Sequence, residues 1–218
     1  MWSSAYAWLT DPANWAGPES IPVRLAQHLG ITLVAVLIAA LIALPLGVVV
    51  GHVRRGTGFI GALTGAARAV PTLGLLTIVG LWIGIGITAP LVALVVLAVP
   101  SLLAGAYAGM QAVDPSIPEG AKAIGMSPLQ VVFRVEIPLA SPTIVGGIRA
   151  ATLQVVATAT LAAYTSDVGL GRFLFAGLKT RDYPMMLAAA LLVVAVTVLL
   201  ELVLAAIQRA VTRRYASA

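Results

Sequence analysis

Residues 114–138 read Asp114-Pro-Ser-Ile-Pro-Glu119-Gly-Ala-Lys-Ala-Ile-Gly125-Met-Ser-Pro-Leu-Gln130-Val-Val-Phe-Arg134-Val-Glu-Ile-Pro138. This stretch separates two strongly apolar runs, and it carries helix signals of its own. Ser116 and Glu119 have the Ser-x-x-Glu spacing of a capping box, in which both side chains bond free N–H groups at a helix start. Gly125 follows where that helix should stop, because glycine readily adopts the left-handed conformation found after helix C-termini. The first half of the stretch therefore predicts a short helix that ends in a glycine joint.

The second half of the stretch predicts another short helix. Ser127 and Gln130 have the Ser-x-x-Gln spacing of a second capping box, and Pro128 occupies the first helical position. Pro138 lies one residue past the expected end of this helix, since the residue before a proline avoids the helical conformation. We therefore expect two capped helices in a loop, residues 110–141, that is held between membrane spans and bound by something outside the membrane.

The composition places the chain in a lipid bilayer. Of 218 residues, 60% are hydrophobic and only 10% are charged, and the mean hydropathy is +1.03, whereas soluble domains have about 25% charged residues. Cysteine is absent, so the chain has no disulfide framework and no thiolate metal site. The net charge of +5 is carried by scattered residues, which suits a membrane protein beside anionic lipid and does not predict nucleic-acid binding.

Apolar runs predict an all-α, polytopic membrane protein with about five transmembrane helices. They lie at about 25–51, 70–86, 89–109, 142–164 and 185–208, each near the roughly 20 residues that a spanning helix needs. Residues 56–69 are expected to form an interfacial lead-in to the second span. Residues 1–24 contain tryptophan and tyrosine among polar positions and are expected to be an external or interfacial segment. Residues 25–209 then form a single transmembrane domain, followed by a cytoplasmic tail, 210–218.

The basic residues predict the orientation of the chain. Five spans place the two ends on opposite sides, and the side with more Lys and Arg should be cytoplasmic. One side holds Arg54, Arg55, Lys122, Arg134, Arg209, Arg213 and Arg214. The other holds Arg24, Arg172, Lys179 and Arg181. The N-terminus should therefore lie outside, with the C-terminus and the 110–141 loop in the cytoplasm.

Motifs for catalysis are absent from the sequence. It contains no His-Glu-x-x-His, no Gly-x-Ser-x-Gly and no Walker-type phosphate loop, so we expect neither catalytic residues nor an ATP site. His28 and His52 stand at opposite ends of the first span and cannot share a metal. Arg149 and Glu201 are ionisable residues inside spans, where such groups are either packed in hydrogen-bonded pairs or functional. A secondary transporter or channel that uses these two residues is the alternative function.

The loop between the third and fourth spans resembles the Glu-Ala-Ala signature of ABC importer permeases. Glu119-Gly-Ala-Lys-Ala-Ile-Gly125 is followed, after nine residues, by Val135-Glu-Ile-Pro138. The signature has the form Glu-Ala-Ala, three residues, Gly, nine residues, Ile-x-Leu-Pro. Gly120, Val135 and Ile137 replace residues of that pattern, and the spacing is intact.

The resemblance extends over roughly residues 25–214 to the osmoprotectant permeases, which import glycine betaine, choline, carnitine or proline. It is carried by Val70-Pro-Thr-Leu-Gly-Leu-Leu, Ile83-Gly-Ile-Gly86, Gly146-Gly-Ile-Arg149 and Leu161-Ala-Ala-Tyr164 with Gly169-Leu-Gly171. One stretch departs from the family. Ser166-Asp167-Val168 stands where the family has small, glycine-rich residues, and this external loop bears on substrate or binding-protein preference.

The resemblance implies a division of labour among several subunits in a bacterial inner membrane. The permease binds no cofactor, and a cytoplasmic ABC ATPase dimer binds ATP and receives the loop helices 117–124 and 128–136 in a groove. A second permease chain, identical or paralogous, completes the path, and an external solute-binding protein delivers the substrate. The implied coupling residues are Glu119, Gly120, Ala121, Gly125, Ser127, Pro128, Val135, Ile137 and Pro138. The candidates for the path or the subunit interface are Pro71, Thr72, Arg149 and Glu201.

Overall fold

The computed structural model describes residues 1–54, 58, 61, 62, 65 and 69–215. Every regular element in this part of the chain is helical, which confirms the all-α class. The elements are α1 (Trp2–Thr10), η1 (Pro12–Trp15), α2 (Ile21–Val53), α4 (Thr72–Ile83), α5 (Thr88–Ala112), α6 (Ser116–Ala123), α7 (Pro128–Val131), η2 (Val132–Glu136), α8 (Ile137–Thr158), η3 (Ala159–Tyr164), α9 (Gly171–Thr180) and α10 (Tyr183–Tyr215).

Four helices are long and apolar enough to cross a membrane: Ile21–Val53, Thr88–Ala112, Pro128–Tyr164 and Tyr183–Tyr215. They contain the spans expected at 25–51, 89–109, 142–164 and 185–208. Each helix extends beyond the apolar run that predicted it. α2, for example, has 33 residues and is about 50 Å long, so its ends pass the hydrocarbon layer and reach the headgroups. α10 likewise continues to Tyr215, into the stretch expected to be a tail.

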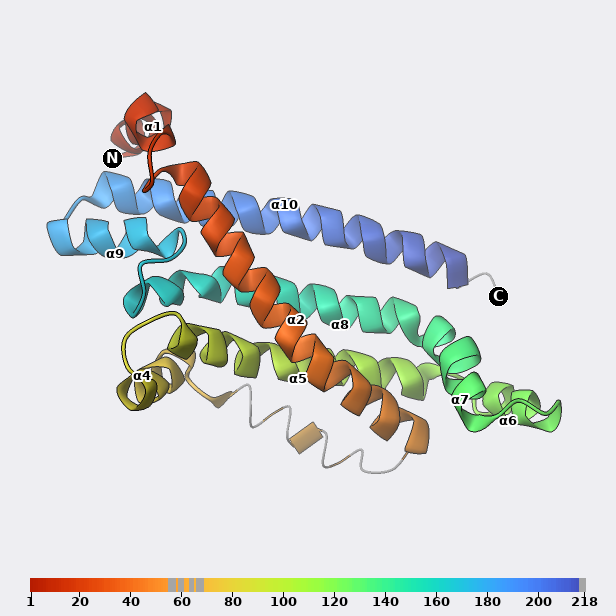
Figure 1. Ribbon diagram of the computed structural model, residues 1–218. Helices are drawn as coiled ribbons and strands as arrows, with labels where there is room; N and C mark the ends of the chain where they lie inside the picture. The colour runs from red at the N-terminus through yellow and green to blue at the C-terminus, as the bar shows by residue number, and fades with distance from the viewer. Residues whose placement is uncertain (55–57, 59–60, 63–64, 66–68, 216–218) are drawn as a thin grey trace.

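The second expected span, 70–86, corresponds to a much shorter helix. α4 has 12 residues and is about 18 Å long, against a hydrocarbon thickness of about 30 Å. Gly84 and Gly86, both at positive φ, follow it and turn the chain into α5. α4 lies at the end of the bundle that also holds α1 and α9, beside the start of α5 (Figure 1). The expected lead-in at 56–69 lies almost wholly outside the described residues.

Small residues let the long helices pack closely around α5. A Cβ added to Gly47 of α2 would lie 2.6 Å from Ala106 Cβ, and one added to Gly105 would lie 2.6 Å from Gly147 Cα of α8. Both distances are shorter than a real Cβ contact, so a side chain at either glycine would collide with the neighbouring helix. These glycines therefore permit close helix contacts of the kind common in membranes. Alanine, leucine and valine fill the remaining core, among them Ala39, Ala98, Leu102 and Val155.

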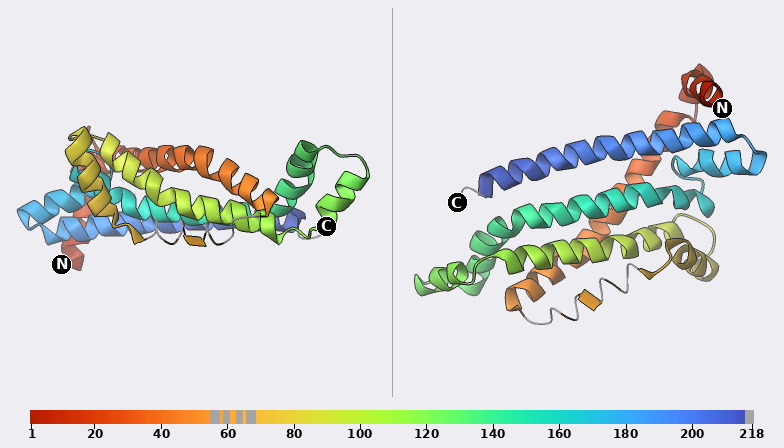
Figure 2. Two further views of the ribbon diagram at one scale, coloured as in Figure 1. Left: turned by 90° about the horizontal axis from the view of Figure 1, so that it is seen from below. Right: turned by 180° about the vertical axis from the view of Figure 1, so that it is seen from behind.

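The bundle has two distinct ends, which the views of Figures 1 and 2 show from several sides. α1, α4 and α9 lie at one end, together with the N-terminus. α6 and α7 project from the other end, where α10 and the described chain also finish. α1 packs on α10, and its Trp8 meets Phe173 of α9 edge-on, with ring centroids 5.1 Å apart. The loop expected to bind a partner is therefore separated from the N-terminal segment by the length of the bundle.

Candidate functional site

The first loop helix, α6, begins at a different cap from the one expected. Ser116 donates both its backbone N–H and its hydroxyl to Oδ1 of Asp114, at 2.9 and 2.8 Å. The backbone hydrogen bond, followed by the hydroxyl bond, holds the pKa of the Asp114 carboxyl below its usual range. The capping box with Glu119 does not form, because Asp114 accepts the Ser116 N–H that the Glu119 side chain would accept, and the Glu119 N–H donates to the carbonyl of Pro115 at 3.3 Å. Glu119 stays exposed, with its carboxylate directed to solvent rather than to the helix start.

Gly125 forms the joint that the sequence predicts. Its φ is +92°, its N–H donates to the carbonyl of Lys122 at 3.0 Å, and the next N–H, of Met126, donates to Ala121 at 3.1 Å. These two bonds are the Schellman motif, which satisfies the free carbonyls at a helix C-terminus. A Cβ on Gly125 would meet nothing within 4 Å. Glycine is therefore required at position 125 by the positive φ of the backbone, and not by a lack of space for a side chain within this chain.

The second loop helix starts as expected but does not stop at Pro138. Ser127 N–H donates to Oε1 of Gln130 at 2.9 Å, and Gln130 N–H donates to Oγ of Ser127 at 3.4 Å, which confirms the second capping box. The helix then widens into a π-helix, η2, where Ile137 N–H bonds to the carbonyl of Val132. The wider turn accommodates the proline ring, which has no N–H to donate. The helix consequently runs through Pro138 into α8, and the expected break is wrong.

The loop helices present an exposed surface that combines apolar side chains with one carboxylate. Ile124 is 82% exposed, Leu129 71% and Phe133 65%. We use the name elbow face for a set of exposed residues on the two loop helices and their joint: Ile117, Glu119, Gly120, Ile124, Gly125, Leu129 and Phe133. Leu129 and Phe133 also line a cavity of about 560 Å³ beside Val49 and Val53 of α2. Of the other expected coupling residues, Ser127 and Pro128 are also exposed, Ala121 is buried, and Val135, Ile137 and Pro138 are half-buried. Ile117 and Ile124 lie outside the four candidate spans, whereas Leu129 and Phe133 lie in the first turns of Pro128–Tyr164. Exposed large apolar side chains of this kind are typical of surfaces that contact another protein or a membrane.

Three hydrogen bonds tie the loop to the end of α2, one of them from Gln111 Nε2 to the carbonyl of Gly51 at 3.1 Å. Arg54 Nη2 donates to the carbonyl of Val113 at 2.5 Å, just before α6. His52 Nδ1 lies 2.5 Å from Oε2 of Glu136, the last residue of η2. The Glu136 side chain is only 2% exposed and the His52 side chain 26%, so the carboxylate of the pair is shielded from solvent. Both ends of the loop are thus connected to one long helix.

The local sequence pattern does not predict the His52–Glu136 pair. The two residues are 84 positions apart, and Glu136 occupies the variable position of the Val135-Glu-Ile-Pro segment. The one available signal is a carboxylate at the very start of an apolar span. Such a residue needs a partner, but nothing in the local pattern says which one.

Arg149 and Glu201 are brought together between α8 and α10. Arg149 Nε donates to Oε2 of Glu201 at 2.8 Å, and its Nη2 donates to Oε1 of the same carboxylate. Arg149 Nη1 also donates to Oε1 of Gln208 at 2.8 Å. A bidentate pair of this kind fixes the two helices against each other. Both side chains are about one third exposed, at 32% and 34%, so the pair lies at the surface of this chain and not in its core.

Pro71 and Thr72 lie on a different element from the Arg149–Glu201 pair. Pro71 accepts the first helical bond of α4, from Leu75 at 2.9 Å, and α4 packs against α5. Leu76 is its one buried side chain. Leu81 is 84% exposed, Trp82 90% and Ile85, in the turn that follows, 95%. One face of α4 thus contacts the bundle, and the rest of its apolar surface is uncovered.

Comparison with known proteins places this arrangement among transport proteins. Residues 43–217 match the family model described as "Binding-protein-dependent transport system inner membrane component". The chain is 34% identical to the choline transport system permease protein of Bacillus subtilis (strain 168), over 85% of this chain and 86% of that protein. It is 32% identical to the glycine betaine/carnitine/choline transport system permease protein of the same organism, over 87% of each chain. A carnitine transport permease protein of Listeria monocytogenes is 30% identical over 89% of each chain.

Solved structures share the fold. The inward-facing structure of the MetNI methionine ABC transporter contains a chain with a TM-score of 0.77 and 23% identity, covering 93% of this chain and 99% of that one. A chain of an amino acid ABC transporter has a TM-score of 0.65 and 20% identity, covering 85% of this chain and 91% of that one. The arrangement of long helices with a projecting helical loop therefore recurs in known transporters.

Proposed function

We propose a solute, an orientation and partners for this chain, which belongs to the family of binding-protein-dependent transport system inner membrane components. The chain is a multi-pass membrane protein and the permease subunit of an ABC importer, a transport component and not an enzyme. Its solute is a small quaternary amine of the osmoprotectant type, such as glycine betaine, choline or carnitine. Proline, which part of the resemblance suggested, is the less favoured candidate because none of the relatives compared above is named for it.

The elbow face carries the proposal. Its uncovered apolar side chains and the exposed Glu119 lie on a rigid helix–glycine–helix unit at one end of the bundle. A cytoplasmic ABC ATPase is the partner that fits: it would bury Ile124 and Leu129 and supply a donor for the Glu119 carboxylate. Movement of the ATPase would then reach α2 through the bonds at Val113 and Glu136.

The orientation follows from the charges and the two ends of the bundle. The elbow face and the C-terminal end of α10 lie at the same end, away from the N-terminus. The basic residues that flank α2 and end α10, Arg54, Arg209 and Arg214, belong to this end. We therefore place this end in the cytoplasm and the N-terminus outside.

A second permease chain would cover the apolar surface of α4. The high exposure of Leu81 and Trp82, together with the short length of α4, suits a helix in the contact between two subunits. The occupant is a membrane-embedded partner of the same fold, because this surface is apolar throughout and carries no charged residue between Thr72 and Ile87. Two such chains would enclose a path that one chain of this size, with few polar residues in its spans, does not enclose.

Reconstitution tests this proposal. The chain is placed in proteoliposomes with its candidate ATPase and solute-binding protein, and uptake of labelled glycine betaine, choline, carnitine and proline is measured with ATP. We expect ATP-dependent uptake of at least one quaternary amine, and none when the ATPase is left out. Uptake that persists without the ATPase would support the secondary transporter that uses Arg149 and Glu201 and would contradict the proposal.

A further inference from the structure

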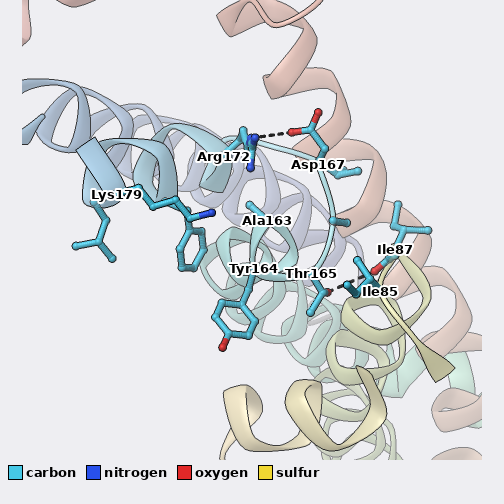
Figure 3. A pocket seen from close by; sticks show the side chains of 13 residues that line it. Ile85, Ile87, Ala163, Tyr164, Thr165, Asp167, Arg172 and Lys179 are labelled. Atoms are coloured by element: carbon cyan, nitrogen blue, oxygen red, sulfur yellow. Dashed lines mark hydrogen bonds and ion pairs between the residues drawn. The ribbon is translucent and has the colours of Figure 1, made fainter. Parts of the chain in front are cut away.

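A cavity of about 710 Å³ opens at the end of the bundle opposite the elbow face. Its walls come from the turn before α5, the end of η3, the loop at 165–168 and one side of α9 (Figure 3). The loop includes Ser166-Asp167-Val168, the stretch that departs from the family pattern. The cavity is large enough for a small organic solute. Besides the hydroxyl residues Thr165 and Ser166, three kinds of lining residue bear on what it could bind.

The first kind is aromatic and apolar. Tyr164 and Phe175 lie side by side, with ring centroids 5.9 Å apart and planes tilted by 55°. Tyr164 is 54% exposed, so its ring is available to a ligand. Ala163 and, on the side of the cavity near Thr165, Ile85 add aliphatic surface. Ring faces of this sort attract a trimethylammonium group through the negative charge density above the ring.

The second kind is a carboxylate that is already neutralised. Oδ1 of Asp167 is 2.8 Å from Nε of Arg172 and 3.2 Å from Nη2 of Arg24. Arg24 is 2% exposed and also donates from Nη1 to the backbone carbonyl of Asp167 at 2.5 Å. Two guanidinium groups therefore hold this carboxylate in place. Asp167 contributes little negative charge to the cavity.

The third kind is a cation without a partner. Lys179 is exposed, extends toward the opening in Figure 3, and has no ion pair or hydrogen bond among the described residues. Because two arginines offset the negative charge of Asp167, the ammonium group of Lys179 gives the cavity a net positive charge. A free ammonium group beside an aromatic wall suits a ligand that carries a carboxylate as well as methylated nitrogen.

We propose that this cavity receives a zwitterionic trimethylammonium carboxylate, such as glycine betaine or carnitine, on the external side of the permease. The N-methyl groups lie against Tyr164 and Phe175, and the carboxylate lies against Lys179. Choline, which has the cation but no carboxylate, meets the uncompensated charge of Lys179 and binds more weakly. This inference rests on the proposed function and adds a site and a preference within the solute class.

Ligand binding to the permease–ATPase complex in nanodiscs, without the solute-binding protein, tests the site. Saturation-transfer NMR on the N-methyl protons detects weak binding of glycine betaine and of choline directly. We expect glycine betaine to bind the wild-type complex more tightly than choline. Lys179→Gln should weaken glycine betaine binding by about fivefold, as for one partly exposed charged contact, and should not weaken choline binding. Lys179→Arg should restore it.

Two matched controls separate the cavity from general charge effects. Arg181→Gln removes the same charge just after α9, at a residue that does not line the cavity, and should leave both ligands unaffected. Tyr164→Phe should keep binding, while Tyr164→Ala should weaken both ligands. Equal binding of the two ligands, or an unchanged glycine betaine affinity in Lys179→Gln, overturns the inference. If neither ligand binds but the complete transporter still imports glycine betaine, the inference fails and the proposed function stands.

Discussion

At the scale of single residues, the loop contains two glycines, and the backbone conformation requires only one of them. Gly125 has a φ of +92°, which costs a residue with a side chain about 1–2 kcal/mol. Gly120, the residue that replaces alanine in the Glu-Ala-Ala pattern, lies inside α6, and a Cβ added there would meet nothing within 4 Å. The conformation therefore demands glycine at position 125 and not at position 120.

Gly125→Asp should abolish transport and leave membrane insertion intact. The new side chain strains the joint and projects a negative charge into the space that the ATPase would occupy, while no core residue is disturbed. Uptake in proteoliposomes and co-purification with the ATPase measure the two effects. A Gly125→Asp variant that co-purifies with the ATPase and transports normally would show that the docking role of the elbow face is wrong.

Gly120→Ala should be stabilising and should retain uptake. Alanine is favoured over glycine in a helix interior by about 1 kcal/mol, and nothing in this chain obstructs the methyl group. Thermal unfolding in detergent measures the gain, and the uptake assay measures function. A loss of uptake would mean that the ATPase approaches this position too closely for a methyl group, which the open surface does not predict.

At the scale of elements, the pair His52–Glu136 connects the loop to α2. Removing either side chain leaves the other without its partner, so each single alanine variant should lose about 1–3 kcal/mol of stability. The double variant should lose much less than the sum. Uptake per ATP hydrolysed should also fall, because the loop then moves without α2. Arg134→Ala, an exposed neighbour in η2, is the matched control. Additive losses in the double variant would show that the two residues do not act through each other.

The pair Arg149–Glu201 should be structural. Glu201→Gln breaks the bidentate contact between α8 and α10 and should lower the thermal stability only slightly, because both side chains are about one third exposed and exposed ion pairs contribute little. ATP-driven uptake should persist in this variant and should not respond to a proton gradient across the membrane. Loss of uptake without loss of stability would favour the alternative in which Glu201 carries a proton or cation.

The sequence predicted most elements, and the misses have physical causes. Four spans, the glycine joint and the second capping box were found because apolar runs and caps are local signals. The first cap was wrong because two carboxylates, Asp114 and Glu119, compete for the Ser116 N–H, and Asp114 accepts it. The break at Pro138 was wrong because a π-turn accommodates the proline. The His52–Glu136 and Arg24–Asp167 contacts join residues 84 and 143 positions apart, and one sequence without a fold cannot pair them.

At the scale of the whole molecule, we propose separate tasks for the two ends. The elbow face at one end would bind the ATPase that powers transport, and the cavity beside Asp167 at the other end would bind the solute. The spans between them are packed closely through glycine and alanine. This division makes the position of the elbow face on the ATPase the central claim.

Cross-linking tests that claim most directly, because the chain has no cysteine. A single cysteine introduced as Ile124→Cys is labelled with a maleimide-linked benzophenone and irradiated in the assembled transporter. Tyr6→Cys, 71% exposed at the opposite end, is the matched control. If the elbow face binds the ATPase, Ile124→Cys forms an adduct with the ATPase and Tyr6→Cys forms none. If the Ile124→Cys transporter imports its solute but gives no ATPase adduct, the elbow face does not bind the ATPase.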